Sequence, residues 1–262
     1  MSGGKISLIK TMTNGTNVYA SLAKGYKQGG FNLGLGLDAN STDRNLAYDP
    51  EFLINYELGI NTKLLNSKIN FNGVLFYSYR EDQQVLISTQ TDPSDPNTFS
   101  FLTQNAAEGV NHGLEINMDI DINEFVTAFL NLGMLKTEIK NWQSRQDLEG
   151  RAQAHAPKRS YAFGLNWVPT SHTYLAIDFT GKSSFYYSDS HDNKSKSYVL
   201  TNLNLGYVKN NWNYELWARN IFDEYYSVRG FYFGNEAPNF IDTLYERHGD
   251  PRSIGLSIRY DF

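Results

Sequence analysis

Apolar and polar residues alternate along much of this chain, most regularly in its last ten residues. There Ile254, Leu256, Ile258, Tyr260 and Phe262 occupy every second position, with small or polar residues between them. Because successive side chains of a β-strand point to opposite faces, this segment predicts a strand with one apolar and one polar face. The same alternation recurs along the whole chain, so we predict an all-β protein.

Eleven segments carry the alternation. Connections after the odd-numbered segments are tight, as at Asn14-Gly15, a pair that tolerates the positive φ of a hairpin turn. The even-numbered segments are followed by loops of roughly ten to twenty-five residues, the pattern of an outer-membrane barrel. The predicted strands are approximately Lys5–Thr11, Asn17–Lys27, Glu51–Asn61, Ile69–Tyr79, Asn111–Ile122, Val126–Met134, Tyr161–Trp167, Leu175–Thr180, Val199–Tyr207, Trp212–Arg219 and Ser253–Phe262.

A soluble β-sandwich also alternates, but its inner face is a packed core and its loops are mixed in length. The polar face predicted here consists of Asn, Glu, Asp, Gly and Ser, which suits a water-filled lumen. Aromatic residues near the strand ends match the girdles at a membrane surface: Tyr26, Tyr79, Phe125, Trp167, Trp212 and Tyr260. The pattern favours a transmembrane, antiparallel, up-and-down β-barrel.

The composition agrees with this fold class and excludes others. The 262 residues include no cysteine, which excludes a disulfide scaffold, and the net charge of −5 provides no basic surface for nucleic acid. No stretch approaches the ~20 apolar residues of a spanning helix. The first residues lack the apolar region of a secretory signal.

The odd strand number is a problem for a closed barrel. An antiparallel meander of eleven strands brings its first and last strands together in parallel, whereas single-chain bacterial barrels have even counts. An open edge in lipid leaves backbone groups unpaired, each costing several kcal/mol. We therefore expect either an error of one in the count or a chain that is part of a larger barrel, and the missing signal segment favours the second.

Several segments resemble the barrels of TonB-dependent outer-membrane receptors, in the same order along the chain. They are Tyr19–Asn32, Asp49–Gly59, Asn105–Glu115 and Ala218–Tyr226, followed by a last strand ending in Phe262. The resemblance implies a 22-stranded barrel around an N-terminal plug, in the outer membrane of a Gram-negative bacterium. It further implies uptake of a ferric siderophore, or of haem, cobalamin or a glycan, energised by TonB–ExbB–ExbD through a TonB box.

The same resemblance implies that residues 1–262 are the C-terminal portion of the barrel domain. The signal peptide, the TonB box, the plug and the first half of the barrel are the parts that this sequence lacks. Its partners would then be outer-membrane lipid, the missing N-terminal barrel half with its plug, and the barrel-assembly machinery. We expect the chain to fold poorly and to transport nothing alone, because its edge strands lack partners.

Three groups of residues are candidates for function. By resemblance, the last strand is an assembly signal, although an ordinary closing strand would look the same. Carboxylates on the polar face would meet basic residues of the plug, or would simply wet the lumen. The assembly-signal residues are Leu256, Ile258, Tyr260 and Phe262, and the carboxylates are Glu57, Glu115, Asp119, Asp178 and Glu215.

The third group lies in the aromatic-rich segment before the last strand. Rings supply contact area and Arg can pair with an anionic chelate, so the group is a candidate ligand site. Alternatively, the rings belong to the outer girdle or pack loop on loop. The residues are Phe231, Tyr232, Phe233, Tyr245, Arg247 and His248.

The sequence offers no catalytic or cofactor chemistry. The five histidines show no paired metal-ligand spacing, and no nucleophile elbow, Walker loop or dinucleotide fingerprint occurs. We expect no enzyme, no cofactor and no metal site. The competing functions are an outer-membrane adhesin or structural barrel without import, and an outer-membrane enzyme with a catalytic group in its lumen. A plug and a TonB box upstream would indicate import.

Overall fold

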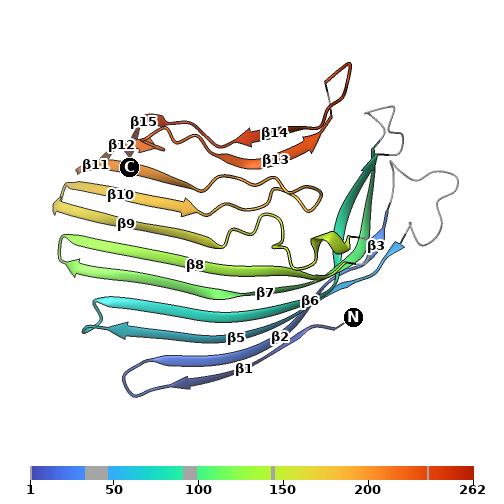
Figure 1. Cartoon of the computed structure of the whole chain (residues 1–262). Coiled ribbons are helices and arrows are strands. Elements are labelled where there is room, and N and C mark those ends of the chain that lie inside the picture. Colours follow the sequence, from blue (N-terminus) through green and yellow to red (C-terminus); the bar gives the residue numbers. More distant parts are fainter. Residues whose placement is uncertain (1, 33–46, 91–98, 143–144, 235) are drawn as a thin grey trace.

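The computed structural model describes residues 2–32, 47–90, 99–142, 145–234 and 236–262. Its main feature is one 11-stranded antiparallel sheet whose strands are neighbours in chain order (Figure 1). The eleven predicted strands are confirmed. They are β1 (Gly4–Thr11), β2 (Asn17–Lys27), β5 (Glu51–Leu64), β6 (Ile69–Gln90), β7 (Phe99–Asn123), β8 (Val126–Asn141), β9 (Arg159–Thr170), β10 (Thr173–Lys182), β11 (Tyr198–Lys209), β12 (Trp212–Arg219) and β15 (Ser253–Tyr260).

Two small hairpins lie in segments that the sequence analysis treated as loops. β3 (Gly30–Phe31) pairs with β4 (Ala47–Tyr48), and β13 (Ser227–Phe233) pairs with β14 (Thr243–His248). A single 3-10 turn, η1 (Gln146–Leu148), lies between β8 and β9. In the part of the chain that the structure describes, no helix is long and apolar enough to cross a membrane.

The two ends of the sheet differ as the connection lengths predict. Figure 1 shows the short turns gathered at one end and the long connections at the other. Gly15 and Asn210 adopt positive φ in two of the tight turns, which is the conformation that Gly and Asn tolerate best. We call these ends the turn end and the loop end.

The predicted lengths of two strands are wrong. Alternation ended near Tyr79 and resumed near Asn111, but β6 continues to Gln90 and β7 begins at Phe99, so only residues 91–98 separate them. Two register shifts between Arg80 and Gln84, with positive φ at Asp82, move the strand out of phase. A bulge of this kind interrupts the period-2 pattern without ending the strand. The predicted loop prolines Pro93 and Pro96 lie outside the described residues.

The sheet has an apolar face that nothing in the described chain covers. Its side chains are strongly exposed: Leu58 is 59% exposed, Leu205 47% and Ile254 66%. The main buried apolar cluster is small and lies at the loop end: Ala107, Ile139, Trp142 and Leu148. A soluble protein of this size would bury such a face in its core, whereas a membrane barrel presents it to lipid.

Candidate functional site

Cross-strand pairing places the five candidate carboxylates on one face of the sheet, opposite the exposed apolar side chains. Glu57 stands opposite Ser21, Glu115 opposite Gly133, Asp178 opposite Asn202 and Glu215 opposite Ser257, and the pairs connect across successive strands. Asp119 lies four residues from Glu115 on the same strand and therefore on the same face. We call this surface the inner face.

Three of these carboxylates accept hydrogen bonds from neighbours on the inner face. Glu57 accepts from Ser21 at 3.3 Å and from the Asn55 amide at 2.8 Å. The Asn202 amide donates to Asp178 at 2.7 Å, and the Tyr174 hydroxyl donates to Glu215 at 2.6 Å. None of the five carboxylates forms an ion pair with a described residue. Their charge is therefore available to a cationic partner.

At the loop end, Arg151 joins two connections that are distant in the sequence. Its guanidinium donates to the carbonyl oxygens of Ser188 at 2.6 Å and His191 at 2.9 Å, and it stacks 3.9 Å from the Tyr186 ring centroid. An ion pair with Asp192 at 3.2 Å adds to these contacts. Residues 145–158 thus form one unit with the 183–197 connection, and we call this unit the loop package.

Burial controls the ionisation of the loop package. It raises the pKa of Asp189, although the positive charge of Arg151 opposes this. Burial also lowers the pKa of His191, and the positive charge of Arg151 lowers it further. For Tyr187, burial together with a hydrogen bond to Glu246 raises the pKa to about 12, so this hydroxyl stays protonated and donates. Asp189 is thus the carboxyl of this unit whose charge is disfavoured.

The β13–β14 hairpin divides the six candidate ligand residues between its two faces. Strand pairing places four of them on one face: Phe231, Phe233, Tyr245 and Arg247. Their neighbours include Arg229, whose guanidinium lies 4.7 Å from the Phe231 ring centroid. Phe233 and Tyr245 have ring centroids 5.1 Å apart. We call this the free face, because the opposite face is the one that packs on the loop package.

The other two candidates belong to the packed face. Tyr232 lies 5.7 Å from the His191 ring, and Glu246 on the same face accepts the hydrogen bond from Tyr187. Both ring nitrogens of His248 are within hydrogen-bond distance of hydroxyls, Tyr225 at 2.5 Å and Ser227 at 3.2 Å. His248 and Tyr232 therefore contribute to holding the hairpin in place, and packing of loop on loop is part of the hairpin's structure.

The residues of the candidate assembly signal lie along the outward side of β15. Leu256 and Ile258 stand opposite Leu216 and Tyr214 of β12 and are 63% and 56% exposed. Tyr260 packs against Trp212 with ring centroids 4.8 Å apart. Among the described residues, β15 pairs with β12 on one side only, so its other edge is open.

Polar contacts that no sequence pattern predicted order the loop end. Glu51 is 5% exposed, forms an ion pair with Arg80 at 2.6 Å and accepts from the Gln84 N–H at 3.0 Å. The Asn105 amide bridges the carbonyls of Asp49 and Asp82. Partners here are about 20 to 60 residues apart in the chain, so no local pattern marks them. In the described part of the chain, no three His, Asp or Glu side chains gather as a metal site would require.

The exposed apolar face, polar inner face and asymmetric connections define an outer-membrane β-barrel protein. The sequence matches the family described as TonB dependent receptor-like, beta-barrel over residues 4–221. The chain therefore belongs to the TonB-dependent receptor family. Its relatives are receptors and transporters of the Gram-negative outer membrane, which confirms the predicted family, location and non-enzymatic class.

Similar proteins match this chain almost end to end. The pesticin receptor of Yersinia pestis is 23% identical over 267 residues, covering 99% of this chain and 36% of that protein. The ferric yersiniabactin uptake receptor FyuA from Yersinia pestis has a similar fold, with a TM-score of 0.78, 20% identity and coverage of 98% of this chain and 37% of that chain. The siderophore receptor PiuA from Acinetobacter baumannii has a TM-score of 0.72 and 16% identity, with coverage of 98% of this chain and 35% of that chain. The chain thus spans about 36% of the length of the curated relatives it matches.

Proposed function

We propose that residues 1–262 form the C-terminal portion of the barrel of a receptor that imports a ferric siderophore with energy from TonB. The observation that carries this proposal is the similarity to receptors whose names specify siderophores, the ferric yersiniabactin uptake receptor and the siderophore receptor PiuA. An adhesin or structural barrel without import is the competing function.

The inner face supports the proposal through its charge. Five carboxylates without an ion pair to a described residue would attract a basic domain inserted in the lumen, as the plug of this family would be. Lumen wetting alone would not require these charges to meet a partner. Neutralising Glu115 and Asp119 should therefore weaken plug association in the complete receptor, measured by protease access to the plug.

The free face of the hairpin supports a ligand-binding role. Arg247 has no hydrogen bond or ion pair to any described residue, and it lies beside exposed rings that could contact the organic part of a chelate. The anchoring of the opposite face would keep these side chains in place before a ligand arrives, which reduces the cost of binding.

The function can be tested by iron uptake. The receptor is expressed in a bacterium without its own ferric-siderophore receptors, and ⁵⁵Fe accumulation from a panel of ferric siderophores is measured with and without TonB. We expect TonB-dependent uptake of one or more of these chelates. The Arg247→Gln substitution should reduce chelate binding about tenfold, because a charge-assisted hydrogen bond to the chelate is lost. Arg252→Gln, just outside the hairpin, is the matched control. Cell adhesion without TonB-dependent uptake would instead favour the structural barrel.

A further inference from the structure

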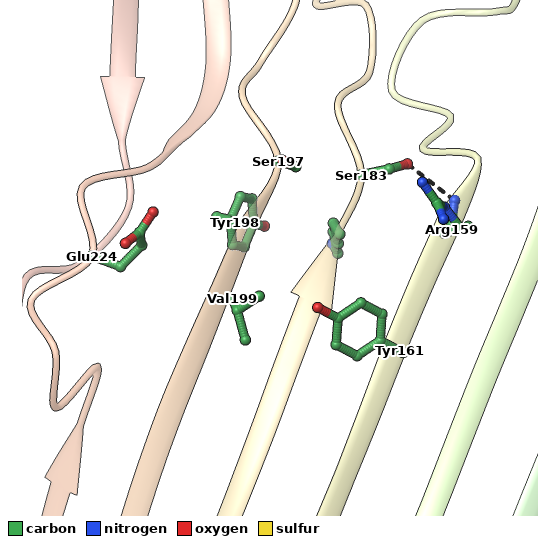
Figure 2. Close-up of a pocket in the computed structure, with 8 residues that line it drawn as sticks. Arg159, Tyr161, Ser183, Ser197, Tyr198, Val199 and Glu224 are labelled. Carbon is green, nitrogen blue, oxygen red and sulfur yellow. Dashed lines mark hydrogen bonds between the residues drawn. The ribbon is translucent and has the colours of Figure 1, made fainter.

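A second candidate site lies away from the inner face and the hairpin. A cavity of about 560 Å³ opens where β9, β10 and β11 reach the loop end of the sheet (Figure 2). Its lining includes Arg159, Tyr161, Ser183, Ser197, Val199 and Glu224.

The cavity belongs to the outward, lipid-facing side of the sheet. Tyr161 and Val199 both stand opposite Gly181, and Tyr161 also stands opposite Leu132, so these side chains share the exposed apolar face. Arg159 is two residues from Tyr161 along β9 and therefore shares that face. The cavity is thus reached from the membrane side of the wall.

Its height matches the outer membrane surface. β9 has 12 residues, and at about 3.3 Å per residue with a tilt of about 45° it rises close to 28 Å from the turn end. The apolar band of an outer-membrane barrel is about 25 Å tall. Arg159, the first residue of β9, therefore lies near the loop-end boundary of that band, from which its long side chain can reach the lipid headgroups.

The lining contains two cations, Arg159 and Lys182, and one carboxylate, Glu224. Lys182 stands opposite Ser160 and Tyr198, so its side chain belongs to the inner face and Arg159 is the cation of the outward face. Neither the guanidinium of Arg159 nor the carboxylate of Glu224 has a hydrogen bond or ion pair to a described residue. The two flank the cavity on opposite sides, with Val199 between them in Figure 2. The Ile221 N–H donates to Thr201 O at 3.0 Å, so the turn that carries Glu224 stays beside β11. At about 4.8 Å per strand, their backbones are separated by roughly 14 Å.

An apolar surface continues from the cavity toward the turn end. The ring centroids of Tyr161 and Phe163 are 6.3 Å apart, and those of Phe163 and Phe179 are 4.7 Å apart. Phe163 remains 42% exposed. The charged cavity lies above an exposed row of rings, in the same order as the charged headgroup of a lipid lies above its apolar acyl chains.

We propose that this cavity binds the headgroup of a lipid that carries a phosphate next to a primary ammonium, a phosphoethanolamine headgroup. Arg159 pairs with the phosphate and Glu224 with the ammonium. The hydroxyls of Ser183 and Ser197 donate to the remaining phosphate oxygens, and the acyl chains lie along Tyr161 and Phe163. A purely anionic headgroup would leave Glu224 unpaired, so the two opposite charges select for a zwitterion. A quaternary ammonium cannot donate a hydrogen bond to Glu224.

Native mass spectrometry of the complete receptor, of which this chain is a part, released from micelles tests this assignment. Phosphatidylethanolamine, phosphatidylglycerol and phosphatidylcholine are added separately, and the fraction of lipid-bound protein is measured for samples with the folded, heat-modifiable gel band. We expect phosphatidylethanolamine to be retained best. Arg159→Gln should reduce its retention about tenfold, because a charge-assisted pair is lost. Glu224→Gln should abolish the preference over phosphatidylglycerol while leaving phosphatidylglycerol retention intact.

Lys209→Gln is the matched control, since Lys209 lies on the same face at the turn end of β11. It should leave retention unchanged. Equal retention of the three lipids by the unmodified receptor, or no effect of Arg159→Gln, would overturn the proposal. So would displacement of the lipid by inorganic phosphate, which would indicate a simple anion site. Analysis of the lipids that co-purify from cell membranes gives the same comparison without refolding.

Discussion

The two faces of the sheet come from alternate residues of the same strands but are built on different principles. On the outward face, most apolar side chains need only be apolar, because lipid surrounds them; Tyr161, which lies over Gly181, is an exception. On the inner face, aromatic rings lie over glycines of the adjacent strand: Tyr19 over Gly59, Phe129 over Gly164, Tyr174 over Gly206 and Trp217 over Gly255. The outward face therefore tolerates most changes of shape but not charge, and the inner face tolerates charge but not bulk where a ring lies over a glycine.

A charge at mid-strand should produce the largest difference between the faces. Leu165 and Asn166 are neighbours in β9 that stand opposite Ile177 and Ala176 and so point to opposite faces. Leu165→Arg places a cation in lipid and should lower the free energy of unfolding of the complete receptor in vesicles by about 2–4 kcal/mol, measured by urea titration.

Asn166→Arg is the internal control, because the same cation then points into the lumen, where the expected loss is below about 1 kcal/mol. If both variants lost the same stability, the assignment of a lipid-facing and a water-facing side would be wrong.

Added bulk should reverse the sensitivity. A Cβ at Gly206 would lie 1.9 Å from an atom of the Tyr174 ring, so Gly206→Ala must displace the ring and strain its hydrogen bond to Glu215. We expect a loss of about 1–3 kcal/mol in the same urea titration.

Gly25→Ala is the matched change, since a Cβ at Gly25 on the inner face meets nothing within 4 Å. It should be neutral or slightly stabilising. Equal losses in the two alanine variants would show that backbone freedom, and not the ring above Gly206, decides the effect.

The same contrast explains what the sequence could predict. Strand number, strand order and the sharing of a face by Glu57 and Glu215 follow from period-2 alternation, because this pattern is visible in each short stretch of the sequence. The ring of Tyr174 over Gly206 could not be predicted, because register depends on pairing between strands about 30 residues apart. The continuation of β6 past Asp82 was missed because a bulge reverses the phase of the alternation.

The candidate sites were predicted in part for a similar reason. Alternation sufficed to place the five carboxylates together. It could not show that the hairpin separates Tyr232 and His248 from the other ring residues, since the hairpin itself was treated as a loop. Arg151 and the cavity at Arg159 depend on contacts between distant connections, for which the sequence contains no periodic signal.

The loop package follows neither rule of the two faces. Its stability should depend on pH, and this is the smallest of the expected effects. Burial raises the pKa of Asp189, and nearby Arg151, His155 and Arg145 only oppose this. A carboxyl with a raised pKa binds its proton more tightly in the folded state. The package should therefore lose stability as pH rises through the interval from the unfolded to the folded pKa of Asp189, by less than about 1 kcal/mol after solvent screening.

Limited proteolysis of residues 183–197 between pH 4 and pH 7 measures this as faster cleavage toward neutral pH, after correction for the pH dependence of the protease on an unfolded peptide. Asp189→Asn cannot ionise and should remove the trend, while Asp192→Asn, whose carboxylate is largely exposed, should retain it. Cleavage that slowed toward neutral pH would mean that the ionised carboxylate stabilises the package, and that attraction to Arg151 outweighs burial.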